Sequence, residues 1–145
     1  MLTIETIAQA WGWNGLVAKS LVDQNSFGNV IVLDHDGRYW RICPEELSCV
    51  IIASNDGEYA RIRSDPAFVR DWAMSKLHTE AREALGPTAE GRCYCLKIPA
   101  VLGGAYAAVN FGMIALDELI SFSGHIAHQI KDLPDGARIE FSFVQ

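Results

Sequence analysis

Two pairs of side chains in this sequence have the types and spacing that metal binding or nucleophilic chemistry needs. Cys93 and Cys95 are two residues apart in the stretch GRCYCLKIPAVLGG, and His125 and His128 are three residues apart further along the chain. Residues two apart on a strand share a face, and residues three apart on a helix do the same. Two thiolates and two imidazoles would complete a tetrahedral zinc site, and a cysteine beside a histidine could act as a nucleophile. A small metal- or thiol-dependent enzyme is therefore one hypothesis.

The helix expected to carry the histidines argues against both kinds of site. It begins at Asp117 and runs to about Lys131, and its polar and apolar residues form two opposite stripes. The polar stripe contains Glu118, Ser121, His125, His128 and Asp132, and the apolar stripe contains Leu119, Phe122, Ile126, Ile130 and Leu133. A strand packed under this helix meets its apolar stripe. The helix itself should therefore separate the cysteines from the histidines.

The four cysteines, Cys43, Cys49, Cys93 and Cys95, have a simpler interpretation. Free cysteine is among the residue types most often buried, and thiols in a reducing compartment stay reduced. A catalytic cysteine would need some exposure and a base within hydrogen-bonding distance. We therefore expect four free and mostly buried thiols, with no metal site, no cofactor and no catalytic residue.

The glycine pair and the acidic pairs do not complete a catalytic pattern either. Gly103-Gly104 follows a predicted strand, but no Lys-Ser/Thr pair or third spaced glycine makes it a phosphate loop. A turn or a helix start already explains each of the acidic pairs, which are Glu45-Glu46, Asp34 with Asp36, and Asp117-Glu118. By elimination, the residues favour a binding protein over an enzyme.

Turn signals and alternating apolar runs predict the elements that make up the scaffold. Residues 29–42 form a hairpin around Asp36-Gly37, a pair that suits the positive φ of a tight turn. Further strands are predicted at residues 47–53, 92–98, 112–116 and 137–144. Helices are predicted after Thr3, from Asp65-Pro66 to Gly86-Pro87, and from Asp117. Together they predict one α+β domain over residues 1–145, with a mainly antiparallel sheet covered by helices.

The hairpin makes two specific predictions. Tyr39 and Trp40 point to opposite faces of their strand, and we expect Trp40 in the core and Tyr39 at least partly exposed. The carboxylates of Asp34 and Asp36 lie at the tip, where a tight turn could hold them outward on a rigid support. The alternative is that both side chains only satisfy the turn.

Composition excludes several classes of function. The 145 residues contain 12 Lys and Arg against 18 Asp and Glu, a formal net charge of −6, so direct binding to nucleic acid is not expected. The start MLTIETIAQAWGW lacks the pattern of a signal peptide, which predicts a cytoplasmic protein. No charge occurs between Ile98 and Leu116, but Pro99 and the glycines divide that stretch. We expect buried loop and strand there, and no contact with a membrane.

Three stretches together resemble one bacterial family. They are YWRICPEELSCVII at residues 39–52, GRCYCLKIPAVLGG at 91–104 and LDELISFSGHIAHQIKDLPDG at 116–136. In this order they are similar to type VI secretion immunity proteins, whose cognate toxins include antibacterial DNases. The resemblance covers most of the chain from about Gly28 onward.

The resemblance implies a cytoplasmic inhibitor that binds the toxin of its own cell or of a sibling and so takes part in bacterial competition. Its partner would be a basic nuclease, whose charge an acidic inhibitor complements. Asp34 and Asp36 are the candidate residues for this contact. Two alternatives stay open: the Cys/His enzyme described above, and a non-catalytic regulatory interaction module.

Overall fold

A four-stranded antiparallel sheet forms the centre of the structure, a computed structural model that describes residues 1–134 and 136. Its strands follow chain order: β1 (Ala18–Gln24), β2 (Val30–Asp34), β3 (Tyr39–Cys43) and β4 (Ser48–Ala53). A separate antiparallel pair contains β5 (Arg92–Leu96) and β6 (Phe111–Ala115). The helices are α1 (Ile4–Trp11), α2 (Asp56–Ser64), α3 (Pro66–Ala73), α4 (Ser75–Leu85) and α5 (Leu116–Ile130). The predicted α+β class with antiparallel strands and covering helices is confirmed.

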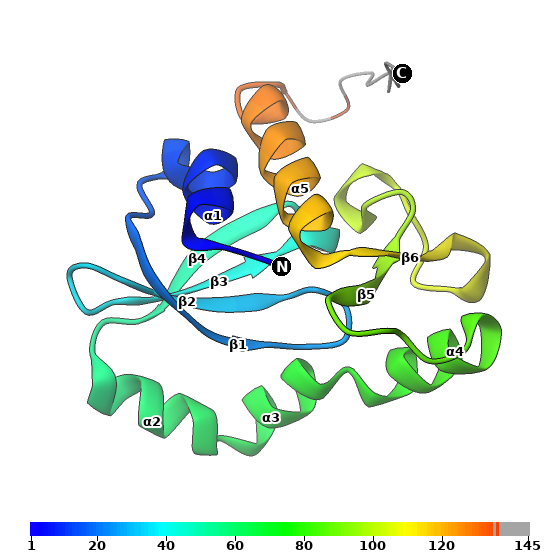
Figure 1. Cartoon of the computed structure of the whole chain (residues 1–145), viewed down its shortest axis with the longest axis horizontal. Coiled ribbons are helices and arrows are strands. Elements are labelled where there is room, and N and C mark those ends of the chain that lie inside the picture. Colours follow the sequence, from blue (N-terminus) through cyan, green and yellow to red (C-terminus); the bar gives the residue numbers. More distant parts are fainter. Residues whose placement is uncertain (135, 137–145) are drawn as a thin grey trace.

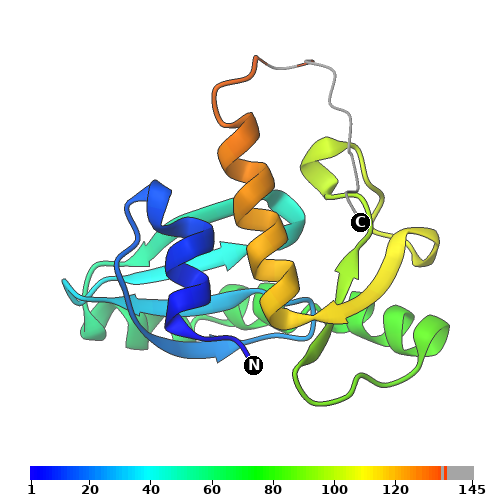
Figure 2. The same cartoon turned by 45° about the horizontal axis from the view of Figure 1, so that its top comes forward.

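Helices cover both faces of the four-stranded sheet. α1 and α5 lie side by side over one face, and α2 and α3 run along the other (Figures 1 and 2). The contact between α1 and α5 is close because Gly124 has no side chain: a Cβ there would lie 2.2 Å from the carbonyl oxygen of Ala10. The predicted caps also form, since Thr3 Oγ1 accepts from the Thr6 amide and Asp65 accepts from the Ala67 amide.

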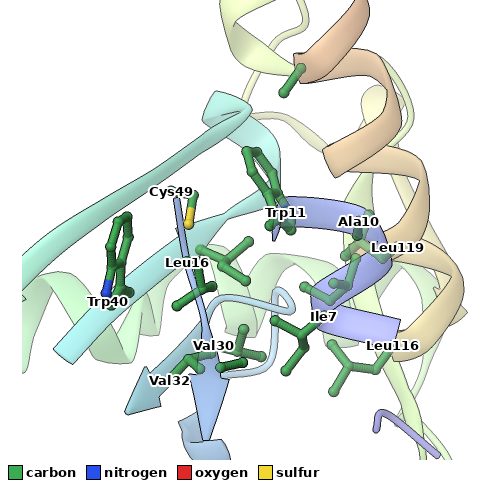
Figure 3. Packing of buried hydrophobic residues seen from close by; sticks show 14 of the residues in the cluster. Ile7, Ala10, Trp11, Leu16, Val30, Val32, Trp40, Cys49, Leu116 and Leu119 are labelled. Atoms are coloured by element: carbon green, nitrogen blue, oxygen red, sulfur yellow. The ribbon is translucent and has the colours of Figure 1, made fainter. Parts of the chain in front are cut away.

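The main core lies between the sheet and the pair α1–α5 (Figure 3). Trp11 and Ile7 of α1 meet Val30 and Val32 of β2, and α5 adds Leu119. A second cluster joins α4 to the β5–β6 pair and contains Phe27, Ala81, Tyr94, Leu96 and Phe111. A third cluster lies on the opposite face of the sheet, where α2 and α3 pack.

The hairpin formed by β2 and β3 is confirmed, but the prediction for Tyr39 is wrong. Trp40 is buried in the main core as predicted, yet Tyr39 is only 9% exposed on the opposite face. Its ring stacks on Tyr59 of α2 with centroids 4.0 Å apart, and its hydroxyl donates to Asp56 over 2.7 Å. Tyr39 is buried because α2 covers a face that the sequence pattern left open to solvent.

The long helix predicted from Asp65 to Leu85 is two helices, α3 and α4. Met74 separates them with a left-handed φ of 46°, a conformation that a residue with a side chain seldom adopts. Another helix, α2, precedes them, and its cap is Asn55, whose side chain accepts from the Glu58 amide. The sequence Asn-Asp-Gly at residues 55–57 is typical of a turn, but here it forms the start of a helix.

The uncharged stretch before α5 is a strand preceded by an exposed loop, so the expectation of a buried loop is wrong. Val109 is 84% exposed, and Ile98 and Val101 are also exposed. Asn110 holds the loop together: its amide donates to the carbonyls of Ile98 and Ala105 and accepts from the Ile98 amide.

The predicted strand at 112–116 corresponds to β6, whereas the strand predicted at 137–144 lies outside the described residues. Among the described helices, none combines the length and apolar character needed to span a membrane.

Candidate functional site

The structure does not bring the predicted cysteine and histidine ligands together. Cys93 and Cys95 share a face of β5, as predicted, and Cys93 is part of the main core. His125 and His128 lie on the exposed stripe of α5, where His128 stacks on Trp13 with ring centroids 4.7 Å apart. In the part of the chain that the structure describes, no three His, Cys, Asp or Glu side chains are grouped as metal ligands would be.

Burial also makes the thiols poor nucleophiles. Burial raises the pKa of Cys93 to about 12 and that of Cys49 to about 12, and it raises the pKa of Cys43 and Cys95 as well. The reactive form of cysteine is the thiolate, which a raised pKa makes scarce at neutral pH. The interpretation of these residues as structural thiols fits this environment, although Cys43 and Cys95 are only partly buried.

We expected Asp34, at the hairpin tip, to face solvent, but it is buried. Its side chain is only 2% exposed and accepts from Trp40 Nε1 at 2.8 Å, from Arg38 Nε at 3.0 Å and from the amides of Asp36 and Arg38. Burial alone would raise the pKa of Asp34, but these hydrogen bonds, led by that from Trp40, hold it below its ordinary value. Asp34 therefore organises the turn, and only Asp36, whose side chain is 78% exposed, presents a carboxylate to solvent.

A groove of about 950 Å³, which the sequence did not indicate, lies beside the sheet. One wall comes from the sheet, where Val50 and Ile52 project from the same face of β4. The opposite wall comes from the α3–α4 junction, with Met74 and Leu77. Tyr106, from the exposed loop between β5 and β6, also lines it. Among the described residues β4 is an edge strand, so this wall of the groove belongs to the edge of the four-stranded sheet.

A chain of polar side chains connects the two walls of the groove. Asn29, fully buried, donates its amide to both oxygens of Glu45 at 3.0 and 2.9 Å. The Asn29 oxygen accepts from Nε and Nη2 of Arg41, whose Nη1 lies 2.5 Å from Asp71 of α3. Arg41 also lies over the ring of Trp72. This network joins β3, and the residue that precedes β2, to α3.

Two adjacent carboxylates mark one end of the groove. Pro44 begins a single 3-10 turn, Pro44–Glu46, which ends at Leu47 with a left-handed φ of 49°. The turn holds Glu45 inward, 6% exposed, and leaves Glu46 exposed, where it accepts from the hydroxyl of Tyr106. Burial, followed by this hydrogen bond, raises the pKa of Tyr106. The Glu45-Glu46 pair was visible in the sequence, but nothing there indicated the distant residues 70–77 and 106 that complete the groove.

Comparison with solved structures finds a shared fold. The fold is similar to that of Atu4351 from Agrobacterium tumefaciens, known from a crystal structure, with a TM-score of 0.52 and 14% sequence identity. The alignment covers 83% of this chain and 61% of that one, so this chain spans less than two thirds of that protein's length. A search of curated proteins found no match.

Residues 53–127 match a protein family described as T6SS immunity protein Tdi1, C-terminal. The match is more than half of the chain and extends from the last residue of β4 into α5. It therefore includes the helices that form one wall of the groove, together with Tyr106. The chain belongs to the Tdi1 family of type VI secretion immunity proteins.

Proposed function

We propose that this chain binds a cognate type VI secretion effector and inhibits it, and that this effector is a DNase. The observation that carries the proposal is the family match over residues 53–127. Inhibition by binding requires no catalytic residue in the inhibitor. The proposal therefore agrees with the separation of the cysteines from the histidines and with the buried thiols.

We propose the groove as the surface that contacts the effector. It combines apolar walls with charged side chains at its rim, which is the mixture found in specific protein interfaces. Val50 and Tyr106 line the groove, and both are large side chains that are exposed in the free chain. Exposed side chains of this kind are ones that a protein interface would cover. Asp36 remains a proposed second contact, on the strength of its exposure at the hairpin tip.

The charge of the chain supports a nuclease as the partner. A DNase must present basic groups to bind phosphates, and a protein with a formal net charge of −6 is attracted to such a surface. Complementary charge accelerates association and lets the inhibitor compete with DNA. Because bacterial DNA is cytoplasmic, we propose that inhibition takes place in the cytoplasm.

Co-expression in a susceptible bacterial host tests this function. The effector is taken from the gene next to the one for this chain and is expressed alone, with this chain, or with an unrelated acidic protein of similar size. We expect only this chain to restore growth, and we expect the purified chain to prevent the effector from cleaving plasmid DNA.

The same experiment separates the two parts of the proposal. If this chain does not restore growth, its assignment as the inhibitor of that effector is wrong. If it restores growth against an effector that leaves plasmid DNA and chromosomal DNA intact, immunity stands and the DNase assignment fails.

A further inference from the structure

We propose that the acidic end of the groove, formed by Glu45 and Glu46, receives a lysine or arginine side chain of the effector. This inference rests on the proposed function and adds to it the chemistry of the contact. It concerns one position on the surface of the partner, namely a basic side chain that enters the groove beside the 3-10 turn.

The first observation is that Glu45 is buried and that no basic side chain of the described residues forms an ion pair with it. Glu45 is 6% exposed, and both oxygens of its carboxylate accept from the neutral amide of Asn29. Among the ion pairs of the described residues, none includes Glu45 or Glu46. A buried carboxylate is ordinarily paired with a cation, because removing the charge from water is costly.

The second observation is that the nearest base is already engaged. Arg41 reaches Glu45 only through Asn29, and its guanidinium is paired with Asp71. Lys76 lines the groove from α4, where its amine lies 3.9 Å from Glu80. Arg70 also lines the groove from the helical side. Arg41 is thus occupied by Asp71, the other two bases lie on the α3–α4 wall, and no ion pair of the described residues neutralises Glu45 or Glu46.

The third observation is the apolar path that leads to the carboxylates. Val50 and Ile52 on one wall face Met74 and Leu77 on the other. Lysine and arginine bury their methylene stems against such surfaces while the charged head binds a polar group. A carboxylate in a partly dehydrated groove attracts that head more strongly than one in bulk water. The groove therefore suits a long basic side chain better than a purely apolar one.

Charge substitutions in this chain test the inference, with the purified effector as the probe. Glu46→Arg reverses the exposed charge, and Glu45→Gln removes the buried one while keeping an acceptor for Asn29. Glu118→Arg, on the exposed stripe of α5, is the matched control because it changes the net charge by the same amount as Glu46→Arg. We expect Glu46→Arg to weaken binding at least about tenfold and to reduce its salt dependence, while the control stays within about twofold.

Thermal unfolding of each variant shows whether a loss of affinity reflects a loss of fold. If the wild-type chain does not bind the effector, the proposed function fails. If the wild type binds and both Glu46→Arg and Glu45→Gln, still folded, bind within about twofold of it, this inference is overturned while the proposed function stands.

A charge exchange gives a second readout that does not depend on the stability of this chain. Single Lys→Glu and Arg→Glu variants of the effector are measured against wild-type and Glu46→Arg chains. We expect one effector variant to lose affinity for the wild type and to recover at least part of it with Glu46→Arg. If no effector variant shows this exchange, the contact that we propose is absent.

Discussion

Asp34 is the side chain whose environment differs most from the sequence-based expectation. It lies on the same face of β2 as Val30 and Val32, and across the hairpin it accepts from the indole N–H of Trp40. Because the carboxylate is buried and satisfies four donors, we expect Asp34→Ala to lower the free energy of unfolding by about 3 kcal/mol. Asp36→Ala should change it by less than about 0.5 kcal/mol, because that side chain is exposed. Urea titration of both variants measures the difference, and equal losses would contradict this account of the turn.

The lowered pKa of Asp34 also predicts how stability depends on pH. A carboxyl group whose pKa is lower in the folded state than in the unfolded chain stabilises the fold when it is ionised. This contribution is complete well above the unfolded pKa of about 3.9, and it is lost as the pH falls from there through the lower folded pKa. We therefore expect the wild type to lose more stability than Asp34→Asn between about pH 5 and the acid limit of the fold. Parallel acid-dependent slopes for the two proteins would show that Asp34 does not contribute.

A residue-level signal could have corrected the prediction at the hairpin tip. Trp40 was predicted to be buried, and a buried indole N–H requires an acceptor. In the two-strand register, Trp40 lies opposite Val32, so Asp34, two residues further along the same face, is the nearest side chain able to accept. The same reasoning does not find the groove. The contact between Glu46 and Tyr106 depends on how a distant loop folds back, and local periodicity does not contain that information.

At the scale of elements, two helical glycines predict opposite effects of the same substitution. An alanine usually stabilises a helix by about 1 kcal/mol relative to glycine. At Gly124 of α5, the new Cβ would lie 2.2 Å from the Ala10 carbonyl oxygen and would push α1 and α5 apart, so we expect Gly124→Ala to cost more than about 2 kcal/mol. At Gly57 of α2, the nearest atom is 3.4 Å away, and Gly57→Ala should be stabilising. Thermal unfolding of the two variants measures the difference. A Gly124→Ala chain as stable as the wild type would contradict the close contact between α1 and α5.

The helices on the second face show where sequence patterns stop being informative. The hairpin, the cap at Asp65 and the stripes of α5 follow from local chemistry and were predicted. The sequence near Met74 contains no glycine or proline that would predict a break between two helices. The break instead depends on the left-handed conformation that Met74 adopts in the packed structure. α2 is largely polar apart from a few residues such as Tyr59, so its pattern gave no sign that it would cover Tyr39. Both errors arise from tertiary contacts that local propensity does not encode.

At the scale of the whole molecule, the region that defines the family does not coincide with a unit of packing. The family match begins at Ala53, yet the buried face of α5 packs on Ile7 and Trp11 of α1 and on strands β2 and β3. A fragment of residues 53–127 would leave Leu119 and Ile120 without those partners and would lose Asn29 and Arg41, which join the sheet to α3. Burying a large apolar side chain contributes about 1.5–3 kcal/mol, so losing several such contacts exceeds the margin of a typical small domain. We therefore expect this fragment to show no cooperative thermal transition by circular dichroism, in contrast to the full chain. A cooperative transition of the isolated fragment would mean that residues 53–127 fold without residues 1–52. The groove, which both segments line, would then be an interface between two separate folding units.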